Sequence, residues 1–350
     1  MTSPTSAAKS AYAAAGVNID NKMDALKAVK TLVGATKTAN VVGGIGSFGG
    51  LCRLPQGSSK DTLLVSSTDG VGTKLKVAVM MKKHDTVGQD IVNHCVNDIL
   101  VQGAKPLFFM DYVGTAKVEP AVFKSVVSGL CKACRENKMA LLGGETAEMP
   151  GLYPVGEYDL VGTIVGTVAK KDLVTGKSIR AGDVIIGLPS GGLQTNGFSL
   201  ARRVIFDLCQ YSWQDKLPGT NQTFGEALLA VHKSFLKPVS ALLSKIKVNG
   251  MAHITGGGFP DNIPRVLPKT VNAEIDRNAW EVPTIFKFIQ NQGKVDRDEM
   301  YRVFNMGIGF VVIVAKRDLA KATNILKAAH QPYSVIGVCR KGTGVVTYAN

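Results

Sequence analysis

Acidic side chains beside glycine clusters are the first residues in this chain that could do chemistry. Asp69–Lys74 (DGVGTK) follows an apolar run and precedes an expected helix, Leu75–Met81, so it offers glycine amides, a helix N-terminus, a lysine and an acid. It lacks the spacing of the P-loop lysine motif. These groups would suit phosphates and a divalent cation. The alternative is a tight strand–helix turn in which Asp69 only caps the helix.

A second glycine-rich segment places two further carboxylates in one expected turn. Gly143–Pro150 (GGETAEMP) follows a short apolar run and ends in proline. Hard cations such as Mg²⁺ prefer carboxylate oxygens. Glu145, nearer the expected strand, is therefore the better candidate ligand, and Glu148 is expected to face solvent or to support the ligands from behind. A purely structural turn is the alternative.

One side of the helix expected over Thr86–Gly103 is polar. Asp90, His94, Asn97 and Asp98 gather there, opposite a broad apolar side. Such a stripe is typical of a solvated helix face, in which His94 does no more than pair with Asp90 or Asp98 at i,i+4 spacing. Asp98 is expected to project away from the core.

A glycine loop near the N-terminus matches the sequence pattern of a dinucleotide-binding motif but not its structural context. Gly44–Gly49 fits G-x-G-x-x-G, and Asp69 follows about 20 residues on, where that motif places an acid. The flanking residues predict neither the strand nor the helix that the motif needs. We therefore expect Gly43–Gly50 to be a mobile flap whose amides approach phosphates, or else an ordinary surface loop.

Two more glycine loops each follow an expected strand in the second half of the chain. Ser190–Gly197 precedes a helix, a geometry suited to phosphate, although Asn196 could simply cap that helix. His253–Gly258 ends in three consecutive glycines, so its amides are accessible. His253 either does acid–base work beside this loop or is a hydrogen-bonded core histidine.

Alternating strands and helices must position these segments. Apart from the helices expected over Leu75–Met81 and Thr86–Gly103, the first half predicts two helices and four strands. The first strand is expected to be buried, and the last, rich in β-branched residues, to be buried on both faces. The helices are Met23–Leu32 and Pro120–Asn137, and the strands are Thr62–Thr68, Leu107–Val113, Met139–Leu142 and Tyr158–Ala169. The second half repeats the alternation, with helices over Asn196–Leu208, Lys233–Ile246, Thr284–Gln290 and Leu319–Ala329 and strands over Asp183–Leu188, Met251–Ile254, Val271–Ile275, Gly307–Val314 and Tyr333–Val338.

A polar, turn-prone segment, Lys170–Gly182, separates the two halves. The sequence therefore predicts an α/β (mixed α+β) protein with two domains, residues 1–171 and 172–350, joined near Lys171.

Composition favours some classes of partner over others. The 350 residues carry 41 basic and 27 acidic side chains, a net charge of +14, but the lysines are dispersed, which favours small anionic substrates over nucleic acid. No apolar run approaches the roughly 18–20 residues that cross a membrane. Six scattered cysteines and no signal-peptide pattern fit the reducing cytoplasm.

Five segments in one order resemble a known enzyme family. DGVGTK, VNDILVQGA, GGETAEMPG, TNGFSL and HITGGGFPDNIPRVLP are together similar to those of the phosphoribosylformylglycinamidine cyclo-ligase (aminoimidazole ribonucleotide synthetase) family, and the similarity spans nearly the whole chain. The resemblance implies ATP and Mg²⁺ as cofactors and formylglycinamidine ribonucleotide as substrate. It implies phosphorylation of the formamide oxygen, then ring closure by a substrate nitrogen, giving aminoimidazole ribonucleotide, ADP and phosphate.

The resemblance also implies an assembly and an arrangement of the domains. The N-terminal sheet would pair across a homodimer interface near the ATP, and the C-terminal sheet would be covered by helices and complete the substrate site. Relatives of the same architecture, of the thiamine-phosphate kinase or selenophosphate synthetase type, are the alternative. Selenophosphate synthetases carry a reactive residue before the glycine loop, and no cysteine precedes Cys52 here.

Site residues follow from the resemblance, motif by motif. Metal ligands are expected at Asp69, Asp98 and Glu145, and catalytic roles at His253, Asp98 and Lys30. ATP contacts are expected at Gly43, Gly44, Gly46, Ser47, Phe48, Gly49, Asp69, Gly70, Gly72, Thr73 and Lys74, and substrate contacts at Thr195, Asn196, Gly256, Gly257 and Gly258. Gln194 departs from the family, whose members commonly have histidine there, and this weakens any role for its side chain.

Overall fold

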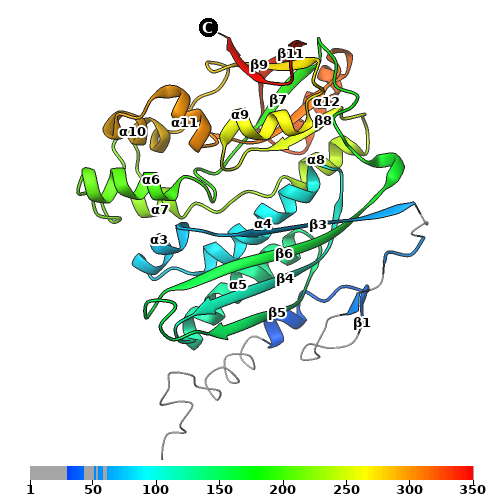
Figure 1. Cartoon of the computed structure of the whole chain (residues 1–350). Coiled ribbons are helices and arrows are strands. Elements are labelled where there is room, and N and C mark those ends of the chain that lie inside the picture. The colour runs from blue at the N-terminus through cyan, green and yellow to red at the C-terminus, as the bar shows by residue number, and fades with distance from the viewer. Residues whose placement is uncertain (1–29, 43–50, 53, 58–60, 350) are drawn as a thin grey trace, which may run out of the picture.

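Two β-sheets organise the molecule (Figure 1). The computed structural model describes residues 30–42, 51–52, 54–57 and 61–349. A four-stranded sheet has the order β3-β6-β4-β5, and a six-stranded sheet has the order β12-β9-β11-β7-β10-β8. A short antiparallel pair, β1 (Val41–Val42) and β2 (Leu51–Cys52), stands apart from both.

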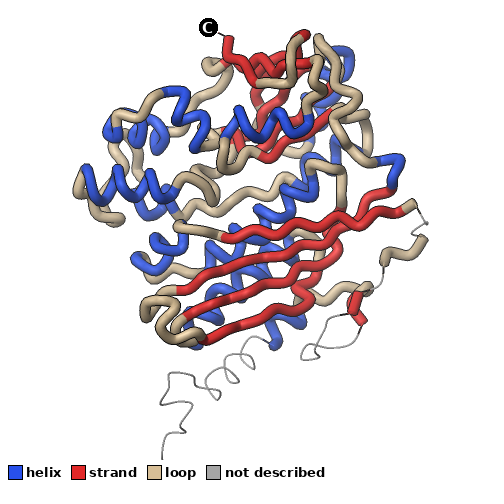
Figure 2. Tube along the Cα trace, viewed as in Figure 1, coloured by secondary structure: helices blue, strands red, loops and turns tan. Residues whose placement is uncertain are grey.

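The four-stranded sheet is mostly antiparallel and carries its helices on one face. Strand β6 lies antiparallel to both β3 and β4, whereas β4 and β5 are parallel and joined by α5. In Figures 1 and 2, α4 and α5 lie behind the sheet, and its near face carries no described helix. The elements are β3 (Thr62–Gly70), α3 (Lys74–Met80), α4 (Asp85–Leu100), β4 (Lys105–Thr115), α5 (Pro120–Glu136), β5 (Ala140–Glu148) and β6 (Tyr158–Ala169).

Glycines fix the distance between α4 and α5. A side chain at Gly88 would overlap the carbonyl oxygen of Val126, and one at Gly129 would overlap that of Asp85. The two helices therefore pack backbone against backbone, which no larger residue permits. This close contact holds α4, the helix that carries Asp98, firmly against its own domain.

Two expectations for this sheet are wrong. Strand β3 is an edge strand rather than a buried one, and Leu64 on it is 63% exposed. Strand β6 alternates between buried and half-buried residues within one chain, so burial of its second face would need a second copy and stays a prediction. The segment Gly143–Glu148 is no turn, because β5 runs through it and both glutamates lie on a strand.

The six-stranded sheet is covered on both faces. Strand β10 is buried along its whole length, since Phe310, Val312 and Val314 pack into one apolar cluster and Ile308, Val311 and Ile313 into another. The strands are β7 (Val184–Pro189), β8 (Gly250–His253), β9 (Val271–Asp276), β10 (Ile308–Val314), β11 (Ser334–Lys341) and β12 (Val346–Ala349). The α-helices are α6 (Phe198–Arg202), α7 (Phe224–Leu228), α8 (Leu236–Leu243), α9 (Gly258–Asn262), α10 (Thr284–Gly293), α11 (Arg297–Val303) and α12 (Leu319–Ala328).

Shorter helical turns link these elements, and two helices differ from expectation. The turns are η1 (Lys170–Asp172), η2 (Arg203–Leu208), η3 (Ile263–Val266) and η4 (Lys316–Asp318). The helix expected from Asn196 begins at Phe198 after Gly197, whose φ of 78° suits glycine, and continues as the π-helical turn η2. The helix expected from Lys233 begins only at Leu236. Among the described residues, no helix combines the length and apolar character needed to cross a membrane.

Candidate active site between the two sheets

Helix α4 joins the two halves of the molecule through its polar side. We expected that side to be solvated, but Asp90 and Asn97 are buried against segment 230–235, which runs toward α8, and so is the neighbouring Asn93. The three side chains bind its backbone: Asp90 accepts from the amide of His232 (2.7 Å), Asn93 donates to the carbonyl of His232 (2.8 Å), and Asn97 donates to the carbonyl of Lys233 (2.7 Å) and accepts from the amide of Phe235 (2.9 Å). The stripe is therefore an internal docking surface.

Lys74 belongs to this docking surface. Its ammonium group is fully buried, lies 2.7 Å from an Asp90 oxygen and donates to the carbonyl of Ala230 at 2.8 Å. Asp90 is equally inaccessible. A contact between Lys74 and ATP, as the DGVGTK motif led us to expect, would therefore require this buried ion pair to open.

Asp69 and Asp98 come together at the end of β3 and on α4. Asp69 accepts from its neighbour Gly70 (2.7 Å) and from Nε2 of His94 (2.8 Å). Asp98 accepts from Nδ1 of His253 (2.8 Å) and from the hydroxyl of Ser67 (3.1 Å). Burial works to raise the pKa of Asp98, but the hydrogen bond and charge of His253 outweigh it and hold that pKa below its ordinary value.

This donor set fits a hard divalent cation. One ligand atom each of Asp69, His94 and Asp98 lie within 4.8 Å of one another. The Asp69 and Asp98 side chains are 44% and 24% exposed, so their oxygens keep free access from the pocket although each already accepts hydrogen bonds. Mg²⁺ is typically held by one or two carboxylates together with phosphates and water, which two partly exposed carboxylates satisfy.

Three histidine rings pack edge to face behind the carboxylates. The centroids of His94, His232 and His253 lie 5.0–5.1 Å apart. Nε2 of His253 faces Nε2 of His232 at 3.1 Å, so both nitrogens of His253 are engaged. Burial lowers the pKa of His253 below its ordinary value, although Asp98 works in the opposite direction. Burial lowers the pKa of His232 further, so this ring is neutral at pH 7.

The expected substrate residues meet this cluster from the second domain. The hydroxyl of Thr195 lies 2.8 Å from Nδ1 of His94, and Asn196 lies beside Gly256 rather than capping α6. Gly257 and Gly258 have φ values of 89° and 58°, and a side chain at Gly258 would overlap the carbonyl of Tyr301. Glycine is required at Gly258, where the loop passes directly under α11.

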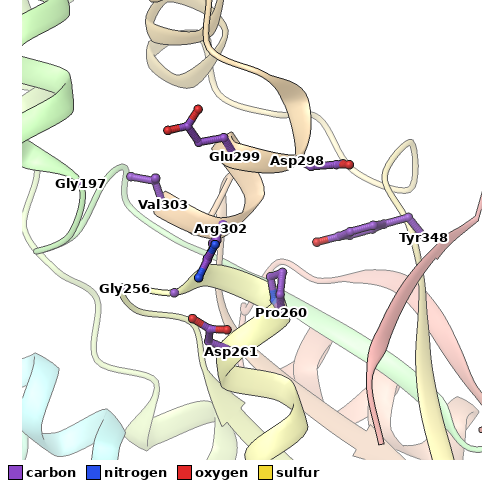
Figure 3. A pocket seen from close by; sticks show the side chains of 10 residues that line it. Gly197, Gly256, Pro260, Asp261, Asp298, Glu299, Arg302, Val303 and Tyr348 are labelled. Atoms are coloured by element: carbon purple, nitrogen blue, oxygen red, sulfur yellow. The ribbon is translucent and has the colours of Figure 1, made fainter. Parts of the chain in front are cut away.

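Two hollows flank this glycine loop. A pocket of about 360 Å³ is lined by Ser67, Asp69, His94, Asp98, His253, Thr255 and Arg265. A wider hollow of about 970 Å³ opens at Gly197, Gly256 and Gly257, and Figure 3 shows Asp261, Glu299, Arg302 and Tyr348 around it. Since Thr255 lines the first and Gly256 the second, a ligand held by the loop can reach both.

Some expected residues lie elsewhere. Glu145 is on β5, and the described helical residues 30–34, which begin with Lys30, connect to that same edge, because the Thr36 hydroxyl accepts from the amide of Leu141. Strand β5 is at the opposite edge of the sheet from β3, which carries Asp69. Neither residue therefore joins the Asp69–Asp98 cluster within one chain. The expected ATP contacts at 43–49 lie outside the described residues.

Other residues enter the site without having been expected. Ser67, His94 and Arg265 line the smaller pocket, and Arg265 is exposed there. Arg265 lies inside the segment HITGGGFPDNIPRVLP, and a positive charge in that motif is the feature of the sequence that could have identified it as a site residue. Gln194 is buried with a φ of 62°, and within the described part of the chain neither of its amide atoms has a hydrogen-bond partner. The neighbouring Thr195, not Gln194, contacts the histidines.

Fold and site together define a class of two-domain α/β proteins with a carboxylate–histidine site between the domains. Solved structures share this fold: thiamine-monophosphate kinase from Stenotrophomonas maltophilia (TM-score 0.66, 16% identity, 92% of this chain and 95% of that one) and hydrogenase maturation protein HypE in complex with ATP (TM-score 0.65, 16% identity, 95% and 92%). At such identities the likeness concerns the fold alone.

Sequence comparison identifies the family. Residues 49–168 match the N-terminal domain, and residues 180–349 the C-terminal domain, of AIR synthase related proteins. The phosphoribosylformylglycinamidine cyclo-ligase of Alkaliphilus metalliredigens is 47% identical over 96% of each chain, and that of Thermoanaerobacter pseudethanolicus is 49% identical over 96% of this chain and 99% of its own. The chain belongs to the AIR synthase related family, and the resemblance found in its motifs is confirmed.

Proposed function

We propose that this chain is an ATP-dependent cyclo-ligase of purine biosynthesis, which converts formylglycinamidine ribonucleotide into aminoimidazole ribonucleotide with release of ADP and phosphate. Full-length relatives that carry the cyclo-ligase name support the reaction. The observation that carries the assignment of the site is the cluster of Asp69, Asp98 and His253, which joins elements of both domains at one pocket.

The reaction needs an activated oxygen rather than a covalent enzyme intermediate. Transfer of the γ-phosphoryl group to the formamide oxygen turns a poor leaving group into a phosphate ester. A substrate nitrogen then attacks the former formyl carbon, the C–O bond breaks, and phosphate departs with the electron pair. The nitrogen's proton passes to the departing phosphate or to solvent. The protein contributes by positioning the groups and stabilising charge.

Asp69 and Asp98 would hold Mg²⁺, which when bound neutralises charge on the nucleotide phosphates. Asp98 faces the pocket, and His253 supports it from behind through the 2.8 Å hydrogen bond. Since both nitrogens of His253 are engaged, we assign it the orientation of Asp98 in place of the acid–base role expected from the sequence. Direct proton acceptance by His253 is the competing hypothesis.

Arg265 and the glycine loops would bind anionic groups. Arg265 presents an exposed guanidinium at the pocket of Asp98 and His253, where a phosphate of either ligand can reach it. Gly70, Gly72 and Thr73 follow Asp69 and would contact ATP, while Thr195, Asn196 and Gly256–Gly258 would contact the substrate.

The proposal includes a homodimer formed through the helix-free face of the four-stranded sheet. That face exposes apolar residues such as Leu64 and Met110. It also carries Glu145, and Lys30 lies near its β5 edge. Since neither reaches the Asp69 cluster within one chain, any contact they make with ATP would come from a second copy. We also place the protein in the cytoplasm, where the free thiols of the described cysteines stay reduced.

ADP formation tests this function. Purified protein with Mg²⁺ and ATP should release ADP only when formylglycinamidine ribonucleotide is present, with aminoimidazole ribonucleotide appearing in equal amount. Thiamine monophosphate is the control substrate, because thiamine-monophosphate kinase shares the fold. ADP release with thiamine monophosphate and none with formylglycinamidine ribonucleotide would favour the kinase.

A further inference from the structure

His94 touches three of the residues that form the site. Its Nε2 lies 2.8 Å from Asp69 and 3.5 Å from Asp98, and its Nδ1 lies 2.8 Å from the hydroxyl of Thr195. Asp69 and Asp98 belong to the first domain and Thr195 to the second. One imidazole ring therefore spans the gap between the carboxylates assigned to the metal and a hydroxyl assigned to the substrate.

The surroundings leave this ring little freedom. His94 is buried on α4, and the rings of His232 and His253 pack against it edge to face. Gly88 and Gly129 lock the same helix against α5. Nε2 is bonded to Asp69, which lines the smaller pocket, and Nδ1 to the hydroxyl of Thr195, so a side chain held this rigidly can fix where both groups point.

We propose that His94 is a positioning residue that orients Asp69 for the divalent cation through Nε2 and Thr195 for the substrate through Nδ1. The substrate half of this proposal rests on the cyclo-ligase reaction proposed above, whereas the metal half stands on the geometry alone. A merely structural histidine would contribute packing and have no separate effect on the two ligands.

The two nitrogens can be tested one at a time. The side-chain amide of asparagine reaches about as far as Nδ1 of histidine, and that of glutamine about as far as Nε2. His94→Asn should therefore keep the contact with Thr195 and lose the one with Asp69, and His94→Gln should do the reverse. Each variant is the matched control for the other. Thr195→Val removes the Nδ1 contact from its other end.

The measurements are binding of Mn²⁺ by electron paramagnetic resonance, KM for formylglycinamidine ribonucleotide, and thermal melting. We expect His94→Asn to weaken Mn²⁺ binding by about 10–100-fold, the usual effect of losing a residue that supports a ligand. Its KM for the substrate should stay within about threefold. His94→Gln and Thr195→Val should raise that KM by about tenfold, the worth of one such hydrogen bond, and leave Mn²⁺ binding unchanged.

Equal effects of His94→Asn and His94→Gln on both ligands, or unchanged Mn²⁺ binding in His94→Asn, would overturn the proposal. Melting identifies any variant that fails to fold, and Thr195→Val then still tests the substrate contact. If the unmodified protein releases no ADP with formylglycinamidine ribonucleotide, the proposed function fails, yet the Mn²⁺ measurement still decides the metal half.

Discussion

At the residue scale, the site consists of carboxylates whose orientation is set by histidines. Asp69 and Asp98 each accept two hydrogen bonds and remain partly exposed. Such bonds fix the orientation of the carboxylates, so their remaining lone pairs point in a set direction before a cation binds. Removing charge from one carboxylate should therefore damage metal binding more than folding.

We expect Asp98→Asn and Asp69→Asn to abolish ADP formation with Mg²⁺ and ATP while leaving the melting temperature near that of the unmodified protein. The substitution removes a hard anionic ligand with almost no change in volume. Steady-state ADP release and thermal melts on the same preparation measure the two effects. Normal turnover in either variant would contradict the metal assignment.

His253→Asn separates orientation from proton transfer. The asparagine amide can replace Nδ1 as the donor to Asp98, so we expect turnover to fall by less than about tenfold if His253 only orients that carboxylate. A proton acceptor would instead lose the ~10²–10⁴-fold that general acid–base catalysis contributes, together with one limb of the pH–rate profile. His253→Ala, which removes the donor as well, should be clearly worse than His253→Asn.

The sequence predicted the two carboxylates and His253 as site residues, but not the contacts that His94 and His232 make behind them. Asp69, Asp98 and His253 stand next to glycine clusters or inside long motifs, which gave a chemical reason to single them out. His94 was seen but interpreted as part of a solvated face, because its partner Thr195 lies 101 residues away in the chain. A contact of that kind has no local signature.

At the element scale, helix α4 was predicted within a few residues, since its apolar side repeats at helical spacing. The same periodicity says only that the other side is polar. It cannot distinguish water from a polar backbone, and here Asp90, Asn93 and Asn97 bind segment 230–235. Strand β5 is longer than the sequence predicts. Glycine is rare in strands, so the expected strand ends at Leu142, but pairing with β4 continues through Gly143 and Gly144.

Asn97→Ala should destabilise the contact between the two domains. The substitution leaves the carbonyl of Lys233 and the amide of Phe235 without their present partner in a buried place. Each such group costs about 1–3 kcal/mol. We expect a lower denaturant midpoint by equilibrium unfolding, with Asn221→Ala, the same substitution at an exposed position, as a control. An unchanged midpoint would show that the docking surface contributes little.

Asp111 on β4 should make stability depend on pH. It lies on the strand face that packs against α5, near Cys131 and Cys134, and burial raises its pKa from 3.8 to about 7. The folded pKa exceeds the unfolded one, so the unfolded state ionises first and stability falls between about pH 4 and pH 7, by at most about 1.4 kcal/mol per pH unit. Unfolding of Asp111→Asn across this range should be flatter. Parallel curves for the two proteins would contradict the shift.

At the scale of the whole molecule, the four-stranded sheet is the one that has a face without covering helices among the described residues. Its helix-free face (Figure 2) carries exposed apolar side chains, whereas both faces of the six-stranded sheet are covered. Exposed apolar patches of this kind often mark interfaces. The assembly was expected from the family resemblance, and no pattern in the strands alone could supply it, because a half-covered sheet alternates in the same way in a monomer.

Leu64→Lys tests the dimer directly. Leu64 is 63% exposed on the edge strand β3, and a charge there should oppose burial against a second copy. Light scattering at micromolar concentration should give twice the chain mass for the unmodified protein and a shift toward the monomer for the variant. ADP formation should fall as the dimer dissociates if Glu145 and Lys30 contact the nucleotide bound by the partner.

Leu208→Lys, at a 56% exposed position in the second domain, is the matched control and should remain dimeric and active. A monomeric unmodified protein would refute the proposed interface, and an active monomeric variant would place the whole site within one chain.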